Sequence, residues 1–221
     1  MSAAAVEGVR EAARGVLRHA LADRVFHWVT AAAVLTLLAT AFLPIVGLRF
    51  SWLTIHWAAG WVLIAALGFH IVRAVLTQDL GRMWIGRTDF RELAAVTRWS
   101  LRRTVQEPPK PGKYSFAQKL VHGLFALALL ASSVTGALMM VKIDTPWWRR
   151  NPYWLADSSW GVIYVFHDLA ALSLVTLVIV HVYFALRPEK LLFLRAMIRG
   201  RITREEFAEH HDSARWQADE R

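Results

Sequence analysis

Five of the nine histidines lie inside long apolar stretches, where an ionisable side chain is costly and usually marks a functional site. They are His27, His56, His70, His167 and His181. One isolated histidine of this kind could be a packing residue bonded to a neighbouring carbonyl group. Five together are poorly explained by packing, and they indicate a bound metal or cofactor. Three others are expected at the surface: His19, His210 and His211.

The spacing of these histidines predicts two sites at two depths. His167 and His181 are 14 residues apart, so on one α-helix they face about the same way and lie roughly 21 Å apart along its axis. If successive helices alternate in direction, His56 can face His167 and His27 can face His181. His70 follows His56 by the same 14 residues and is a second candidate for the partner of His181. The geometry leaves both candidates open.

The types of side chain available narrow the cofactor to haem. Di-iron sites in helix bundles need several inward-facing carboxylates, and the apolar stretches contain one acid, Asp168. Zinc needs three or four protein ligands at one point, whereas only two histidines meet at each depth. The chain has no cysteine, which excludes disulfides, cysteine-ligated iron–sulfur clusters and thioether-attached haem. We therefore predict two b-type haems, each with two histidine ligands.

The elements that must position these histidines are predicted to be membrane spans. Of 221 residues, 56% are hydrophobic and 11 are tryptophan, and the mean hydropathy is +0.33, which is too apolar for an ordinary soluble domain. The expected fold is an all-α, four-helix transmembrane bundle with two haems stacked across the membrane. Its spans, each above the ~20 residues required, are expected at approximately 25–46, 51–76, 115–141 and 158–187.

The basic residues are concentrated on one side of these spans. The formal net charge is +9, and 20 Lys and Arg residues lie in the 1–24 lead-in, the 77–114 loop or residues 187–221, which end span four and form the tail. The other two connections carry four. The positive-inside rule then places both termini in the cytoplasm of a bacterial inner-membrane protein. The basic excess is expected to face lipid headgroups rather than nucleic acid. We expect three parts: 1–24, a span domain 25–187, and a tail 188–221.

Two helix starts are predicted outside the spans. Asp89 followed by Glu92 has the spacing of an N-cap and its third-position acid, opening a helix to about Arg103. Thr203 and Glu206 have capping-box spacing, which predicts a final surface helix in the tail.

Several short motifs between Asp23 and about Trp216 resemble those of one family. They are DRVFHW at 23–28, HWAAG at 56–60, GKYSFAQK at 112–119 and GRIT at 200–203. The 14-residue histidine spacing and the His210, His211 and Trp216 tail also match. Together they resemble the gamma, or cytochrome b, subunit of membrane-bound, quinone-linked formate dehydrogenases. The tail and the GKY segment separate this family from the related hydrogenase cytochromes b.

The resemblance implies a ligand assignment. His56 with His167 would hold an outer haem, and His27 with His181 an inner haem, leaving His70 as a neighbour or packing residue.

The resemblance also implies a quinone site, for menaquinone or ubiquinone, beside the inner haem. Its residues would be Ser115, Ala117 and Gln118, with Ser115 and Ala117 standing where the family has Asn and Gly.

By the same resemblance, the chain would be a respiratory electron-transfer subunit of a quinone-reducing complex. Electrons would come from an iron–sulfur beta subunit, and formate would be oxidised on a molybdenum or tungsten alpha subunit, not on this chain. The complex could form a higher oligomer. The alternatives are the cytochrome b of a hydrogenase or another quinone-linked oxidoreductase, and a transporter that uses histidines as a proton relay.

Overall fold

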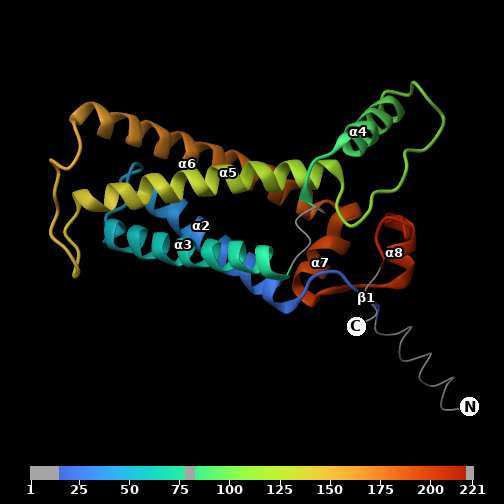
Figure 1. The fold of residues 1–221 in the computed structure, drawn as a ribbon, viewed down its shortest axis with the longest axis horizontal. Coiled ribbons are helices and arrows are strands. Elements are labelled where there is room, and N and C mark those ends of the chain that lie inside the picture. The colour runs from blue at the N-terminus through green and yellow to red at the C-terminus, as the bar shows by residue number, and fades with distance from the viewer. Residues whose placement is uncertain (1–14, 78–82, 218–221) are drawn as a thin grey trace, which may run out of the picture. The chain divides into compact units, whose positions relative to one another are not determined.

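The computed structural model describes residues 15–77 and 83–217, and four long helices dominate it (Figure 1). They are α2 (Leu21–Phe42), α3 (Trp52–Thr77), α5 (Phe116–Met139) and α6 (Asp157–Leu186). Each is long and apolar enough to cross a membrane. The predicted fold class, an all-helical protein with four membrane spans, is confirmed.

The shorter elements lie between and after these helices. They are α4 (Arg87–Ser100), α7 (Leu191–Arg199) and α8 (Arg204–His210), with 3-10 turns η2 (Met140–Lys142) and η3 (Pro188–Lys190). Two short strands, β1 (Val16–Leu17) and β2 (Arg201–Ile202), pair antiparallel.

Helix α2, which carries the first expected span, begins and ends four residues before the expected range of 25–46. Pro44 lacks an amide N–H and disfavours helical conformation in the residue before it, so the helix ends just ahead of it. Gly47 then adopts a φ of 93°, and its N–H donates to the Pro44 carbonyl at 3.1 Å. A positive φ is readily accessible only to glycine, so a tight turn replaces the last predicted turn of helix.

Asp89 is not the N-cap residue of α4, so that prediction is wrong. The N-cap is Gly86, and the carboxylate of Asp89, at the third helical position, accepts a hydrogen bond from the Gly86 N–H at 2.8 Å. Asp89 is buried, and its carboxylate pairs with Lys119 of α5 at 2.8 Å. A tertiary ion pair therefore decides where this acid lies. Glu92, one turn later, likewise pairs with Arg215.

The capping box of α8 is confirmed. The Thr203 hydroxyl accepts from the Glu206 N–H at 3.1 Å, and the Glu206 carboxylate accepts from the Thr203 N–H at 2.9 Å.

The chain forms two compact units. The first, here the membrane unit, comprises Val25–Thr77 and Gly123–His181. Its four helices run side by side (Figure 1) around a thin core. That core is made of Ala33, Val34, Leu63, Ala128, Leu129 and Leu174. Many large apolar side chains elsewhere on the helices are exposed, which is expected of a surface whose solvent is lipid rather than water.

The second, here the terminal unit, contains described residues 15–24, 83–122 and 182–217. Strand β1 joins the tail to the lead-in, and Val16 packs with Ala196, Ile202 and Trp216.

Arg18 lies at the centre of the terminal unit and is 2% exposed. Its guanidinium donates to His211 Nε2 at 2.7 Å and to the Lys113 carbonyl at 3.0 Å, and it lies 4.7 Å from the Phe193 ring centre. Burial lowers the pKa of Arg18 to about 10, so it remains charged at neutral pH.

His211 is 4% exposed, so the prediction that it lies at the surface is wrong. Its Nδ1 lies 2.7 Å from the Gly112 carbonyl. Since a carbonyl only accepts and Arg18 only donates, His211 is neutral, with its proton on Nδ1. This donor arrangement holds the tail against the segment that precedes α5.

We expect the terminal unit to lose stability on mild acidification. Burial, reinforced by the positive charges of Arg18 and His210 and opposed by the hydrogen bond to Gly112, lowers the pKa of His211 to about 4. Between pH ~6.5, the unfolded pKa of a histidine, and pH ~4 the unfolded state binds a proton on His211 that the folded state does not bind. The free energy of unfolding therefore falls by up to about 1.4 kcal/mol for each unit by which the pH is lowered. Above pH ~6.5 the contribution of His211 to stability is constant.

The measurement is proteolysis of the tail as a function of pH. Replacing His211 with Gln, which stays neutral, should flatten the profile between pH ~6.5 and ~4. Asp89 and Glu206 add their own loss of stability only below about pH 5, because the unfolded pKa values of their carboxyl groups are about 4, so they leave the range from pH ~6.5 to ~5 undisturbed. At both acids burial opposes the shift, yet hydrogen bonds to the carboxylates lower their pKa values below the ordinary range. An unchanged slope in the Gln variant would contradict the assignment.

Candidate haem-binding histidine pairs

The membrane unit brings four of the five predicted histidines together in two pairs. His56 of α3 and His167 of α6, the outer pair, have ring centres 6.3 Å apart. His27 of α2 and His181 of α6, the inner pair, have ring centres 6.2 Å apart. Because His167 and His181 lie on one continuous helix, the pairs are separated by roughly 21 Å along it.

Both spacings fit an iron atom held between two imidazoles. Two opposed metal–nitrogen bonds of about 2.0–2.1 Å, added to the ring radii, put the ring centres roughly 6–6.5 Å apart. A direct N–H···N hydrogen bond would bring the rings about 1 Å closer. Among the described residues no three His, Cys, Asp or Glu side chains converge on one point. The donor set therefore fits haem, which brings the other four iron ligands itself.

Each histidine of the outer pair contacts a threonine on a neighbouring helix. The Thr40 hydroxyl of α2 lies 2.8 Å from His56 Nδ1, and the Thr135 hydroxyl of α5 lies 2.8 Å from His167 Nδ1. In both rings the nitrogen left for a metal is Nε2. Sequence reasoning missed both threonines. Their positions near the outer ends of two spans, level with the histidines, were the available signal.

The inner pair is surrounded by aromatic rings. The edge of Phe125 lies against His181, with ring centres 5.8 Å apart, and Trp28 lies against His27 at 5.1 Å. His70, the other candidate for this site, stacks on Phe26 with ring centres 4.2 Å apart. The arrangement therefore favours His27 as the partner of His181.

The absence of a side chain at Gly136 leaves room for the His167 ring. Sequence reasoning did not identify this glycine. A Cβ there would lie 3.3 Å from His167 Cε1, and the neighbouring Thr135 holds Nδ1 of the same ring at 2.8 Å. At Gly60 and Gly68, which the sequence suggested as places for a porphyrin, an added Cβ would meet no atom within 4 Å.

Replacing Gly136 with Ala should weaken haem binding at the outer pair about 10- to 100-fold, the usual effect of disturbing the support of a metal ligand. The inner haem should be unaffected. Haem titration into the purified protein, followed in the Soret band, measures this. Gly161→Ala in α6, where an added Cβ meets nothing within 4 Å, is the matched control. Equal affinities in the two variants would contradict the prediction.

The residues predicted to bind quinone are engaged at the start of α5. The Gln118 side-chain oxygen accepts from the Ser115 N–H at 2.9 Å, and the Ser115 hydroxyl accepts from the Gln118 N–H at 3.4 Å. These two contacts form a capping box. Ala117 beside them is exposed. The structure thus gives Ser115 and Gln118 a helix-capping role, and quinone binding there stays a prediction.

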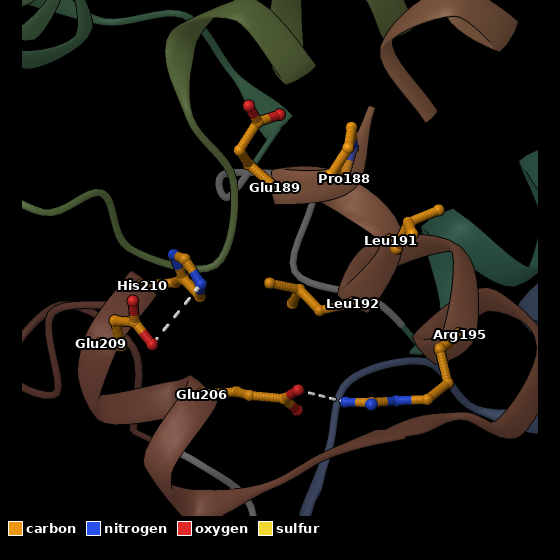
Figure 2. A pocket seen from close by; sticks show the side chains of 8 residues that line it. All are labelled: Pro188, Glu189, Leu191, Leu192, Arg195, Glu206, Glu209 and His210. Carbon is orange, nitrogen blue, oxygen red and sulfur yellow. Dashed lines mark hydrogen bonds and ion pairs between the residues drawn. The ribbon is translucent and has the colours of Figure 1, made fainter. Parts of the chain in front are cut away.

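A cleft of about 600 Å³ in the terminal unit is lined by both charged and apolar side chains (Figure 2). Glu206 pairs with Arg195, and Glu209 lies 4.0 Å from His210. The lining residues are Pro188, Glu189, Leu191, Leu192, Arg195, Glu206, Glu209 and His210.

Comparison with known proteins agrees with this chemistry. No match was found among curated proteins. The model of a family described as prokaryotic cytochrome b561 matches residues 18–200, a range that contains the four spans and both histidine pairs. Proteins of this family bind haem b. The chain belongs to the prokaryotic cytochrome b561 family and is a multi-pass membrane cytochrome b that serves in electron transfer.

Proposed function

We propose that this chain is the dihaem cytochrome b subunit of a quinone-linked formate dehydrogenase. It would carry electrons from an iron–sulfur subunit to a quinone on the cytoplasmic side, while formate is oxidised on a molybdenum- or tungsten-containing subunit. The observation that carries the proposal is the presence of two histidine pairs at two depths, sharing α6. The motifs from Asp23 to Trp216 support the choice of formate dehydrogenase.

The chain's own residues would supply ligands, orientation and insulation. His56 and His167 would hold one haem, and His27 and His181 would hold the other. When bound, each haem would supply a one-electron redox centre. Between the two pairs the four helices contribute the apolar core. This core excludes water and keeps the local dielectric low, which is one of the factors that tune the redox potential.

A second candidate is the cytochrome b of a hydrogenase or another quinone-linked oxidoreductase. The family match supports keeping this candidate, because the family description specifies a cytochrome b and does not specify its electron donor. The residues of this chain would act in the same way in either complex. A proton-relay transporter is the alternative of another class, and it would show no Soret band.

The test is purification of the complex under conditions that retain its subunits. We expect about two b-type haems per chain by pyridine haemochrome. We also expect haem reduction on adding formate and reoxidation on adding a quinone. Reduction by hydrogen but not by formate would support the hydrogenase candidate. A folded chain without haem would overturn the electron-transfer function.

A further inference from the structure

We propose that Thr40 and Thr135 are positioning residues that fix the tautomer and orientation of His56 and His167. The inference rests on the proposed role of these histidines as axial ligands and extends it to residues outside the ligand set. It follows from the number of protons available to each hydroxyl group.

The Thr40 hydroxyl has three polar neighbours and one proton. It lies 2.8 Å from the Thr36 carbonyl, 3.0 Å from the Leu37 carbonyl and 2.8 Å from His56 Nδ1. The two carbonyls only accept hydrogen bonds. If the hydroxyl gave its proton to His56, its lone pairs would face both carbonyl oxygens at repulsive distances. It therefore donates to its own helix and accepts from His56 Nδ1–H.

Thr135 repeats this arrangement at the other histidine. Its hydroxyl lies 2.6 Å from the Ala131 carbonyl, 3.2 Å from the Ser132 carbonyl and 2.8 Å from His167 Nδ1. The same argument makes His167 a donor through Nδ1. Helix α5, which carries no histidine of either pair, thus contributes Thr135 to the outer site, and α2 contributes Thr40.

A proton held on Nδ1 leaves the Nε2 lone pair free for a metal. A hydrogen bond donated from Nδ1 also makes Nε2 more basic, which stabilises ferric over ferrous iron and lowers the reduction potential. The contacts described for the inner pair are instead with the rings of Trp28 and Phe125. The threonines would therefore lower the potential of the outer haem selectively, which favours electron flow from the outer to the inner site.

The experiment is a redox titration of the visible spectrum of the purified complex, for wild type, Thr40→Val, Thr135→Val and the double variant. The outer haem is identified as the one-electron wave missing from His167→Ala. Valine keeps the shape of threonine and removes the hydroxyl. In each single variant we expect the potential of the outer wave to rise by up to about 59 mV. This shift corresponds to a tenfold change in the oxidised-to-reduced ratio of that haem. The inner wave should not move.

Two further variants separate positioning from packing. Thr40→Ser retains the hydroxyl and should restore the wild-type potential. Thr36→Val removes a hydroxyl one turn away on the same helix, which bonds to the Ala32 carbonyl, and should leave both waves unchanged. Loss of the outer haem alone in Thr40→Val, reversed in Thr40→Ser, would also support the proposal.

An unmoved outer wave in the double valine variant, with both haems bound, would overturn the role of the threonines and leave the haem assignment standing. Wild-type protein without haem would overturn both.

Discussion

Replacing His167 with Ala should remove the outer haem and leave the inner haem in place, so that haem content falls from about two per chain to about one. Iron held by two imidazoles would lose one of its two bonds to the protein, so we expect His56 alone to hold the haem too weakly for it to survive purification. His56→Ala should have the same effect. Pyridine haemochrome of the purified variants measures the ratio.

The inner site offers a sharper form of the same test. His27→Ala should remove one haem, because the His27 ring lies 6.2 Å from that of His181. His70→Ala is the matched control. It removes a histidine of the membrane unit that stacks on Phe26, and it should keep both haems. The opposite result, with one haem lost in the His70 variant and two kept in the His27 variant, would assign the inner ligand to His70.

The closeness of the rings within each histidine pair could be anticipated because the relevant information in the sequence is periodic, whereas their role as haem ligands stays a prediction. Long apolar segments fix the number of spans, and 14 residues on a helix return a side chain to nearly the same face. Depth and direction then leave His56 as the natural partner of His167. Depth does not distinguish His27 from His70 as the partner of His181, because the distinction depends on how each helix is rotated about its axis.

The errors have a common origin in tertiary contacts. Asp89 was expected to be the N-cap residue of α4, but it lies at the third helical position, and its carboxylate pairs with Lys119, which lies 30 residues away in the sequence. His211 was placed at the surface because a polar tail is normally exposed, yet its ring is buried against Arg18, 193 residues earlier. A local sequence pattern contains no information about contacts between residues so far apart in the chain.

Thr40 and Thr135 escaped detection for a related reason. A threonine bonded to its own helix is common in membrane spans, so its type carries no signal. Only the rotation of α2 and α5 shows that these two hydroxyls face imidazoles.

Replacing Arg18 with Met should destabilise the terminal unit by about 3 kcal/mol. Methionine preserves much of the apolar stem but leaves His211 Nε2 and the Lys113 carbonyl without their donor. Each buried polar group left unsatisfied costs about 1–3 kcal/mol. The contact with the Phe193 ring, at 4.7 Å, is lost as well and is worth about 0.5–2 kcal/mol.

The readout is the rate at which a protease removes the tail from the intact, haem-containing protein. When local opening is fast relative to cleavage, the rate follows the population of the open form. A loss of about 3 kcal/mol should therefore accelerate it roughly 100-fold. Haem content should be unchanged, because the histidine pairs belong to the membrane unit.

Arg199→Met provides the matched control for the change in charge. Arg199 ends α7 in the same unit and is exposed, so its removal deletes one positive charge without uncovering a buried partner. If Arg18 acted only through the charge that orients the spans, the two variants would be cleaved at the same rate. A difference of roughly 100-fold assigns the effect to the buried hydrogen bonds, because charge alone cannot distinguish the two positions.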